Sequence, residues 1–142
     1  MSNQNFKNHS RFVPLYHYVA LTLVLAILVG ASINLYYNAK QNTYSSWLIF
    51  ALSIIVALLW FFSRAFAIKA QDRVIRAEEN FRHYILTGKQ LSSQLHIKQI
   101  VALRFASDEE FVALAQKAAT EQLSGKAIKQ AIVNWRGDYY RV

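Results

Sequence analysis

The sequence predicts an all-α membrane protein, a two-helix transmembrane hairpin whose second helix extends into a small cytoplasmic helical domain. Two long apolar runs, residues 18–37 and 47–66, lie close together in a chain of 142 residues, of which 54% are hydrophobic. Only 17% are charged, against roughly a quarter in soluble domains. The charges are also segregated, because residues 1–63 contain three basic side chains and no acidic one, whereas all 8 acidic residues lie further on. The first half of the chain is therefore suited to lipid and the second half to water.

A cytoplasmic N-terminal segment, residues 1–17, precedes the first predicted transmembrane helix, residues 18–37. The apolar run of this helix, VALTLVLAILVGASINL, approaches the roughly 20 residues that cross about 30 Å of hydrocarbon. A signal peptide is the alternative, because Lys7 and Arg11 precede the run and Val29-Gly30-Ala31 offers the small residues that a signal peptidase needs.

An external loop, residues 38–46, and a second transmembrane helix, residues 47–66, complete the predicted hairpin. The loop sequence NAKQNTYSS is short and rich in turn-forming residues, so the two helices are expected to run antiparallel. Trp47 and Trp60 lie near the two ends of the second apolar run, as expected for rings at the level of the lipid headgroups. The apolar runs inside the two spans, residues 19–35 and 47–62, contain no ionisable residue, which argues against the proton relays and ion pathways of transporters, and Arg64 at the end of the second span can reach the interface.

Small residues four apart recur in both spans. The pairs are Ala26 with Gly30 and Ser53 with Ala57. Because such pairs let two helix backbones approach closely, we expect them to pack the hairpin, with docking against a larger membrane partner as their second use.

The distribution of Lys and Arg predicts that both termini lie in the cytoplasm, since positive charge is retained on that side of the membrane. The loop contains Lys40 alone, whereas Lys7 and Arg11 precede the first span. Four further basic residues follow the second apolar run within a few turns: Arg64, Lys69, Arg73 and Arg76. We therefore expect a multi-pass membrane protein with residues 38–46 outside.

The second helix is expected to continue past the membrane as one rod, because neither Pro nor Gly occurs from Trp47 to Thr87. Its apolar positions alternate three and four apart, the spacing of a coiled-coil seam. They are Ala67, Ala70, Val74, Ala77, Phe81 and Tyr84. We expect this seam to pack on the chain's own later helices, with a coiled-coil dimer as the alternative. The charged residues opposite are expected to face solvent: Lys69, Asp72, Arg73, Arg76, Glu79 and Arg82.

The cytoplasmic helical domain, residues 67–142, is predicted to add three short helices to this rod. The first carries an apolar stripe over residues 97–105. The second opens with a capping box formed by Ser107 and Glu110 and runs to about Leu123. The third turns one apolar face inward, made of Ile128, Ala131, Ile132 and Trp135.

Four segments spread over nearly the whole chain carry a family pattern. They are KNHSRFVPLYH (residues 7–17), QDRVIRAEE (71–79), QIVALRFASDEE (99–110) and IKQAIVNWRGDYYRV (128–142). Together they resemble an uncharacterised family of short bacterial two-span membrane proteins, known only as a domain of unknown function. The resemblance implies the two-span topology and a cytoplasmic domain. It implies no activity.

The residue types that carry chemistry form no recognisable catalytic or cofactor site. Without cysteine, disulfides, thiolate metal sites and cysteine nucleophiles are excluded. The 4 histidines form no short-range ligand pair, so we expect neither a bound metal nor a haem. The acidic residues 108–110 suit the first turn of a helix, where they oppose its dipole. We therefore predict no enzyme activity, no cofactor and no small-molecule substrate.

The sequence favours a non-catalytic accessory or scaffolding subunit of an inner-membrane protein complex, acting through its cytoplasmic helical domain. The expected partners are membrane lipids, other membrane-protein subunits or further copies of the chain. The candidate interaction residues are of the aromatic and Arg types favoured at interfaces: Arg73, Arg76, Arg104, Trp135, Arg136, Tyr139, Tyr140 and Arg141. The tail among them has an alternative use, which is to close the chain's own core.

A membrane-anchored, helix-turn-helix-like nucleic-acid-binding protein is the alternative function. The formal net charge of +8 and the three short helices expected over residues 97–135 are typical of a basic trihelical reader. Basic residues beside a membrane are explained more simply by attraction to anionic lipid.

Overall fold

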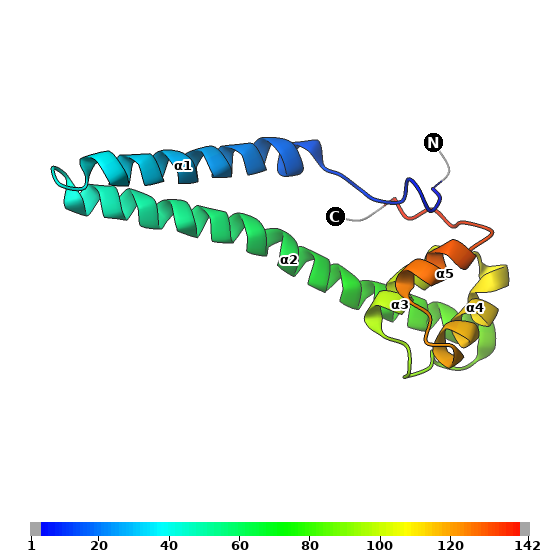
Figure 1. Ribbon diagram of the computed structural model, residues 1–142. Helices are drawn as coiled ribbons and strands as arrows, with labels where there is room; N and C mark the ends of the chain where they lie inside the picture. Colours follow the sequence, from blue (N-terminus) through cyan, green and yellow to red (C-terminus); the bar gives the residue numbers. More distant parts are fainter. Residues whose placement is uncertain (1–3, 140–142) are drawn as a thin grey trace. The chain divides into compact units, whose positions relative to one another are not determined.

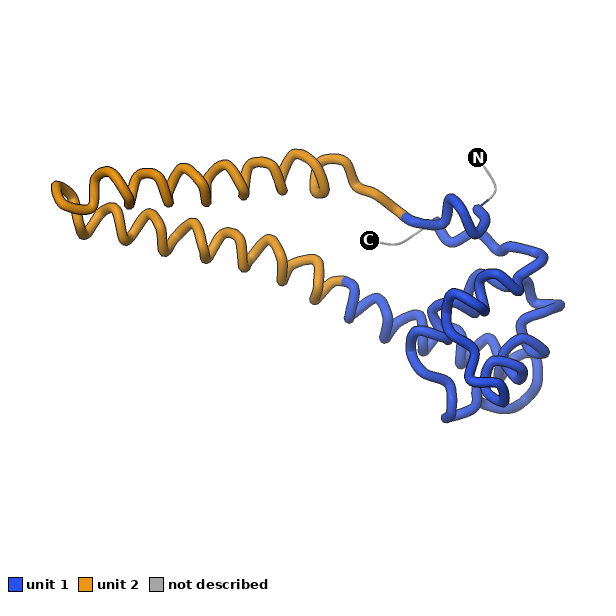
Figure 2. Tube along the Cα trace, viewed as in Figure 1, with its two compact units in different colours: residues 1–10, 68–142 blue, residues 11–67 orange. Residues whose placement is uncertain are grey.

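The computed structural model describes residues 4–139, and over this range the chain is all-α, with five α-helices and one π-helical turn. It divides into two compact units (Figure 2). We call residues 11–67 the hairpin unit and residues 1–10 with 68–142 the head unit. Helix α2, Thr43–Thr87, begins in the hairpin unit and ends in the head unit. The all-α class is confirmed, and so is the unbroken helix expected from the second apolar run to Thr87.

The first apolar helix starts directly after Pro14. Figure 1 draws this helix in blue and labels it α1. It opens as a π-helical turn, Leu15–Ala20, and continues as α1, Leu21–Asn38. Proline suits this place, because its missing N–H falls among the first-turn groups that have no partner within a helix. The His17 ring also holds the helix start, since its Nδ1 lies 3.1 Å from the backbone nitrogen of Val13.

The connection between the two long helices is shorter than the predicted loop. Residues 39–42 join α1 to α2, and the polar residues 43–46 already form the first turn of α2. The Thr43 hydroxyl donates to the Ala39 carbonyl oxygen at 2.6 Å, and the Ser46 amide donates to the Asn42 carbonyl oxygen at 3.0 Å. These bonds satisfy backbone groups where the chain reverses.

Buried and half-buried residues recur three and four apart on both helices of the hairpin unit. They are Leu21, Val24, Leu28, Ala31 and Leu35 on α1, and Ser46, Phe50, Ser53, Ala57 and Trp60 on α2. Ala31, Ser46 and Ser53 are the most deeply buried, as expected where small residues let helix backbones approach. The prediction that Ser53 and Ala57 pack the hairpin is confirmed.

The matching prediction for Ala26 and Gly30 is wrong. Both residues are exposed, and nothing lies within 4 Å of the place that a Cβ on Gly30 would take. The buried small residue of α1 is Ala31, because the seam follows the alternating spacing of Leu28, Ala31 and Leu35 and not the four-residue pair.

One end of the hairpin unit is closed by an aromatic cluster. The Tyr16 ring stacks on Trp60 with centroids 5.1 Å apart, and its hydroxyl donates to the Trp60 carbonyl oxygen. The Arg64 guanidinium lies 5.7 Å from the centre of the Tyr16 ring. A cation over an aromatic face at the end of an apolar helix is typical of the boundary between lipid and water.

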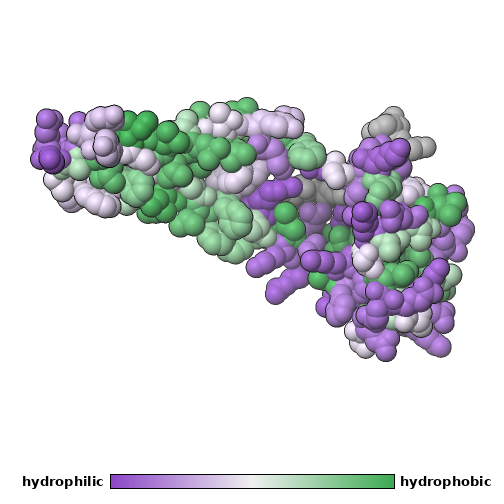
Figure 3. Space-filling model, in the orientation of Figure 1, coloured by the Kyte–Doolittle hydropathy of each residue, from purple (hydrophilic) through white to green (hydrophobic). Residues whose placement is uncertain are grey.

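Outside its seam, the hairpin unit presents apolar side chains on its surface. Figure 3 shows them over most of the visible hairpin, with polar side chains gathered at the loop. Both long helices, Leu15–Asn38 and Thr43–Thr87, are long and apolar enough to cross a membrane.

The head unit encloses its own hydrophobic core with α3, Ile97–Leu103, α4, Asp108–Thr120, and α5, Gly125–Ala131. The largest fully buried apolar side chains are Leu103, Phe105, Phe111 and Ile128. Helices α3 and α5 approach so closely that a Cβ on Gly125 would lie 2.9 Å from the Lys98 carbonyl oxygen. Glycine is therefore required at this position. The Ser124 hydroxyl caps the start of α5 by accepting a hydrogen bond from the Ala127 amide at 3.1 Å.

The predicted capping box of α4 is wrong, although Ser107 occupies the N-cap position as expected. The Ser107 hydroxyl accepts no cap hydrogen bond, and the Glu110 carboxylate does not reach back to Ser107. This carboxylate accepts from the backbone nitrogens of Val133 at 3.1 Å and Asn134 at 3.0 Å. Glu110 is used to hold the C-terminal segment, whose own amides would otherwise lack partners.

The last helix is shorter than predicted, because α5 ends at Ala131 and Ile132 is already extended. Trp135 therefore lies outside the helix, in a short antiparallel bridge to Ala106. The Arg136 amide donates to the Phe105 carbonyl oxygen at 2.7 Å and extends this pairing.

Candidate interaction site

One arginine of α2 fixes that helix to the rest of the head unit. Arg82 Nη1 lies 3.0 Å from Glu79 Oε2, and Arg82 Nη2 lies 2.6 Å from Asp108 Oδ1. The same Nη2 donates to the Ala106 carbonyl oxygen at 2.8 Å, and the guanidinium lies 4.3 Å from the centre of the Phe111 ring. These contacts tie α2 to the start of α4.

The Glu79 carboxylate is the buried member of this cluster, with its side chain only 8% exposed. Desolvation raises the pKa of this carboxyl above its ordinary value of 4.5, while the hydrogen bond and the charge of Arg82 oppose the rise. The prediction that Glu79 and Arg82 face solvent is therefore wrong.

The face of α2 that packs in the head unit is not the predicted seam. Ile75 and Glu79 are 5% and 6% exposed, whereas Val74, Phe81 and Tyr84 are 55%, 66% and 55% exposed. The contacts of Arg82 to an acid, a carbonyl and a ring select the more polar face of the helix. The apolar residues opposite stay in solvent, and we call them the exposed α2 stripe: Ala70, Val74, Ala77, Phe81 and Tyr84.

Two of the candidate interaction residues belong to the packing of the head unit. Arg104 Nε lies 3.2 Å from Asp138 Oδ2, and its guanidinium lies 4.6 Å from the centre of the Phe105 ring. The Trp135 ring lies 5.2 Å from the same phenylalanine. At these positions the tail closes the chain's own core, which was the alternative use of the tail.

The N-terminal segment joins the same packing, although no sequence pattern indicated it. The His9 ring lies 5.7 Å from Phe105 and 5.9 Å from Trp135. Gln4 and Asp138 exchange two hydrogen bonds, of 3.0 Å and 2.8 Å, between the Gln4 amide side chain and the Asp138 backbone. Gln4 and Asp138, near the two ends of the described range, thus both belong to the head unit.

The other candidate residues lie at the surface or beyond the described range. Arg73, Arg76, Arg136 and Tyr139 are exposed. Tyr140 and Arg141 lie outside the described residues. Of the candidate interaction residues that the structure describes, the exposed basic ones are therefore Arg73 and Arg76 on α2 and Arg136 in the tail.

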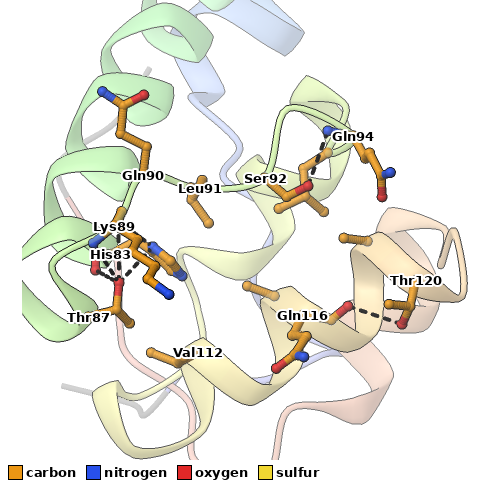
Figure 4. Close-up of a pocket in the computed structure, with 13 residues that line it drawn as sticks. His83, Thr87, Lys89, Gln90, Leu91, Ser92, Gln94, Val112, Gln116 and Thr120 are labelled. Carbon is orange, nitrogen blue, oxygen red and sulfur yellow. Dashed lines mark hydrogen bonds between the residues drawn. The ribbon is translucent and has the colours of Figure 1, made fainter.

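A groove of about 500 Å³ lies between the end of α2, the following loop and α4 (Figure 4). Apolar side chains of α4 line it, among them Val112 and Ala115. The polar groups bind the loop: His83 Nδ1 lies 2.8 Å from the Lys89 carbonyl oxygen, and the Lys89 amide donates to the Thr87 hydroxyl at 3.1 Å. They hold the loop against α2.

The four histidines occupy structural positions. His9 lies among aromatic rings, His17 at a helix start, His83 against a loop carbonyl and His96 at the N-cap of α3. Among residues 4–139, no group of three or more His, Asp or Glu side chains is placed to hold a metal ion.

The whole chain, residues 1–142, matches the model of a family of unknown function, DUF6526. The uncharacterised family expected from the four sequence segments is thereby confirmed. No curated protein and no solved structure matches the chain.

Proposed function

We propose that this chain, which belongs to the family of unknown function DUF6526, is a non-catalytic accessory or scaffolding subunit of a bacterial inner-membrane protein complex. In this proposal the hairpin unit spans the membrane twice and the head unit binds other subunits from the cytoplasm. The observation that carries the proposal is the exposed apolar surface of the hairpin unit, because most large side chains of α1 and the first half of α2 face outward.

An apolar surface of this extent needs a cover. Contiguous exposed patches on soluble monomers are rarely larger than roughly 300–600 Å². Lipid is the cover that both helices fit, since each is long enough to cross the hydrocarbon layer. Lipid and neighbouring membrane subunits are accordingly the proposed surroundings of the hairpin unit.

The proposed orientation places both termini in the cytoplasm. Lys7 and Arg11 precede α1, whereas Lys40 is the single basic residue in the connection between the long helices. The contact of Arg64 with Tyr16 supports a membrane boundary at the other end of the hairpin. Reporter fusions at Asn42 and at the C-terminus test the orientation, and an externally active C-terminal fusion would contradict it.

In the head unit, the largely buried side chains of Arg82 and Gln99 are engaged in the unit's own packing. A partner would therefore be bound by exposed residues of this unit. Arg82 binds two acids and a carbonyl, and the Gln99 amide donates to the Ala118 and Leu123 carbonyl oxygens at 3.3 Å and 2.8 Å. Arg76 and Arg136 remain exposed, and arginine is enriched among residues that dominate binding energy.

Purification of the tagged full chain in mild detergent, followed by mass spectrometry, tests the proposal. We expect stoichiometric amounts of at least one other membrane protein. Recovery of the chain alone, from cells that express it at its natural level, would contradict the accessory role. Arg136→Ala is expected to lower recovery of the partner roughly tenfold, the equivalent of about 1.4 kcal/mol. Lys117→Ala, which removes an exposed basic residue of α4, is the matched control and is expected to leave recovery unchanged.

Nucleic-acid binding is the competing hypothesis, and the same purified protein tests it. The last of the three short helices, α5, has 7 residues, and the Lys129 ammonium lies 3.0 Å from His9 Nε2 and 5.6 Å from the centre of the Phe105 ring. These contacts favour a role in packing for Lys129. A salt-dependent mobility shift of DNA by the full chain would support the competing hypothesis instead.

A further inference from the structure

The exposed α2 stripe has the spacing of a helix-pairing surface. Its residues, from Ala70 to Tyr84, follow one another at intervals of four, three, four and three, which places them at the a and d positions of successive heptads. Val74, Phe81 and Tyr84 are each more than half exposed, although each would gain free energy by leaving water. A seam of this kind pairs with a second helix of the same spacing.

The head unit does not compete for the stripe, because it packs against the other side of α2. In the same heptads Ile75 and Arg82 take b positions and Glu79 takes an f position, which point away from an a and d seam. Ile75 is buried and Arg82 binds Asp108. Asn80, at a g position, accepts from the Leu91 amide at 2.9 Å and leaves the a and d residues of the stripe exposed. A second helix can join the stripe while the core of the head unit stays in place.

Two charges beside the stripe identify the partner. Arg73 takes a g position and Glu78 an e position, and both are exposed. Neither is in an ion pair among residues 4–139, and five residues of separation puts them about 140° apart around their own helix. In a parallel pair, a g residue lies beside the next e residue of the other helix. Two copies of this chain would therefore match Arg73 with Glu78 twice, as two-fold symmetry requires.

We propose that the chain forms a parallel homodimer through the exposed α2 stripe, with Arg73 of each copy paired with Glu78 of the other. An antiparallel pair would set g against g and e against e, which leaves these charges without opposite partners. Parallel is also the direction that two copies inserted in one membrane adopt, and to this extent the inference rests on the proposed function. Confinement to a membrane raises the local concentration, so a short seam suffices.

Disulfide cross-linking of the full chain in lipid vesicles tests the seam, because the chain has no cysteine of its own. The d positions of a parallel pair come within the roughly 4.4–6.8 Å between Cα atoms that a disulfide spans, and c positions do not. Ala77→Cys, at a d position, is expected to give a covalent dimer on oxidation with copper phenanthroline. Arg76→Cys, the neighbouring exposed c position, is the control. Equal cross-linking of both variants, or of neither, would overturn the proposal.

Charge reversal tests the register and the identity of the partner. Arg73→Glu and Glu78→Arg are each expected to raise the dissociation constant of the dimer on the order of tenfold, since each creates two like-charge contacts. The double variant restores the pairing and is expected to return within about threefold of the original value. Failure of the double variant to recover would refute the parallel register. Fluorescence energy transfer between labelled full chains, diluted with lipid, measures the dissociation constant of the dimer for the two single variants and the double variant.

The homodimer and the accessory role fail separately. A dimer purified without any other protein would support this inference and contradict the proposed function. A chain that cross-links only to a different subunit, or whose stripe binds lipid in place of a second copy, would contradict this inference and leave the accessory role intact.

Discussion

Replacement of Arg82 by alanine isolates the contact that determines which face of α2 packs. The change removes the cation between Glu79 and Asp108, the donor to the Ala106 carbonyl and the group over the Phe111 ring. Arg76→Ala is the matched control, since Arg76 is an exposed arginine on the same helix.

The expected loss depends on how far each partner can return to water. The Asp108 side chain is 60% exposed, so the loss of its ion pair with Arg82 contributes no more than about 1 kcal/mol. Glu79 is 8% exposed and keeps a buried charge without its cation, a situation that costs about 3–5 kcal/mol when the charge cannot neutralise itself. Protonation relieves part of that cost, because the pKa of Glu79 is already raised. We therefore expect Arg82→Ala to destabilise the head unit by about 3 kcal/mol, and Arg76→Ala by less than about 0.5 kcal/mol.

Urea unfolding of the full chain in detergent measures this loss. Trp135 reports on the head unit when Trp47 and Trp60 are replaced by phenylalanine, because the 3 tryptophans of the chain then reduce to one. The double variant Glu79→Gln/Arg82→Ala leaves no buried charge and is expected to lose less stability than Arg82→Ala alone. A double variant as unstable as the single one would refute the electrostatic reasoning, and an Arg82→Ala loss equal to that of Arg76→Ala would refute the role of the contact.

Three further predictions concern the same unit. Gly125→Ala is expected to destabilise it by about 1–3 kcal/mol, because the new Cβ would lie 2.9 Å from a backbone oxygen, whereas Gly30→Ala, in open space, is expected to change thermal unfolding little. Gly88→Ala is expected to cost about 1–2 kcal/mol, since Gly88 ends α2 with φ at 71°. The raised pKa of Glu79 means that the folded state binds this proton more tightly than the unfolded state, so this residue adds stability as the pH falls from neutral towards 4.5. Glu79→Gln is expected to remove that increment, which urea titrations at several pH values would show as a flatter profile.

The long elements follow from the sequence because they depend on local patterns. The end of α2 before Gly88 agrees with the prediction, because glycine stops helices. The first apolar helix begins at Leu15, directly after Pro14 and ahead of the predicted residue 18, and proline is a residue that opens helices. The Ser124 cap is local in the same sense. Each of these features is decided within a few residues of chain.

The packing partners do not follow from the sequence, because they join distant residues. Arg82 meets Asp108 across 26 residues, and Gln4 meets Asp138 across 134. A charged residue that binds a partner so far along the chain has the same local pattern as one that faces solvent. Glu110 shows the same limit, since its spacing from Ser107 indicated a cap while its carboxylate binds the amides of Val133 and Asn134.

Hydrophobicity alone favours burial of the apolar face of α2 in the head unit and exposure of its charged face. The structure shows the reverse. The chain buries Glu79 and Arg82, which requires desolvation of a carboxylate, and exposes Val74, Phe81 and Tyr84. Natural sequences agree across levels except where another function is served. A helix that only had to complete the head unit would gain more from the opposite rotation, because apolar side chains stabilise by burial without a charge to compensate. This use of the two faces agrees with the proposed pairing of the apolar face with a second helix.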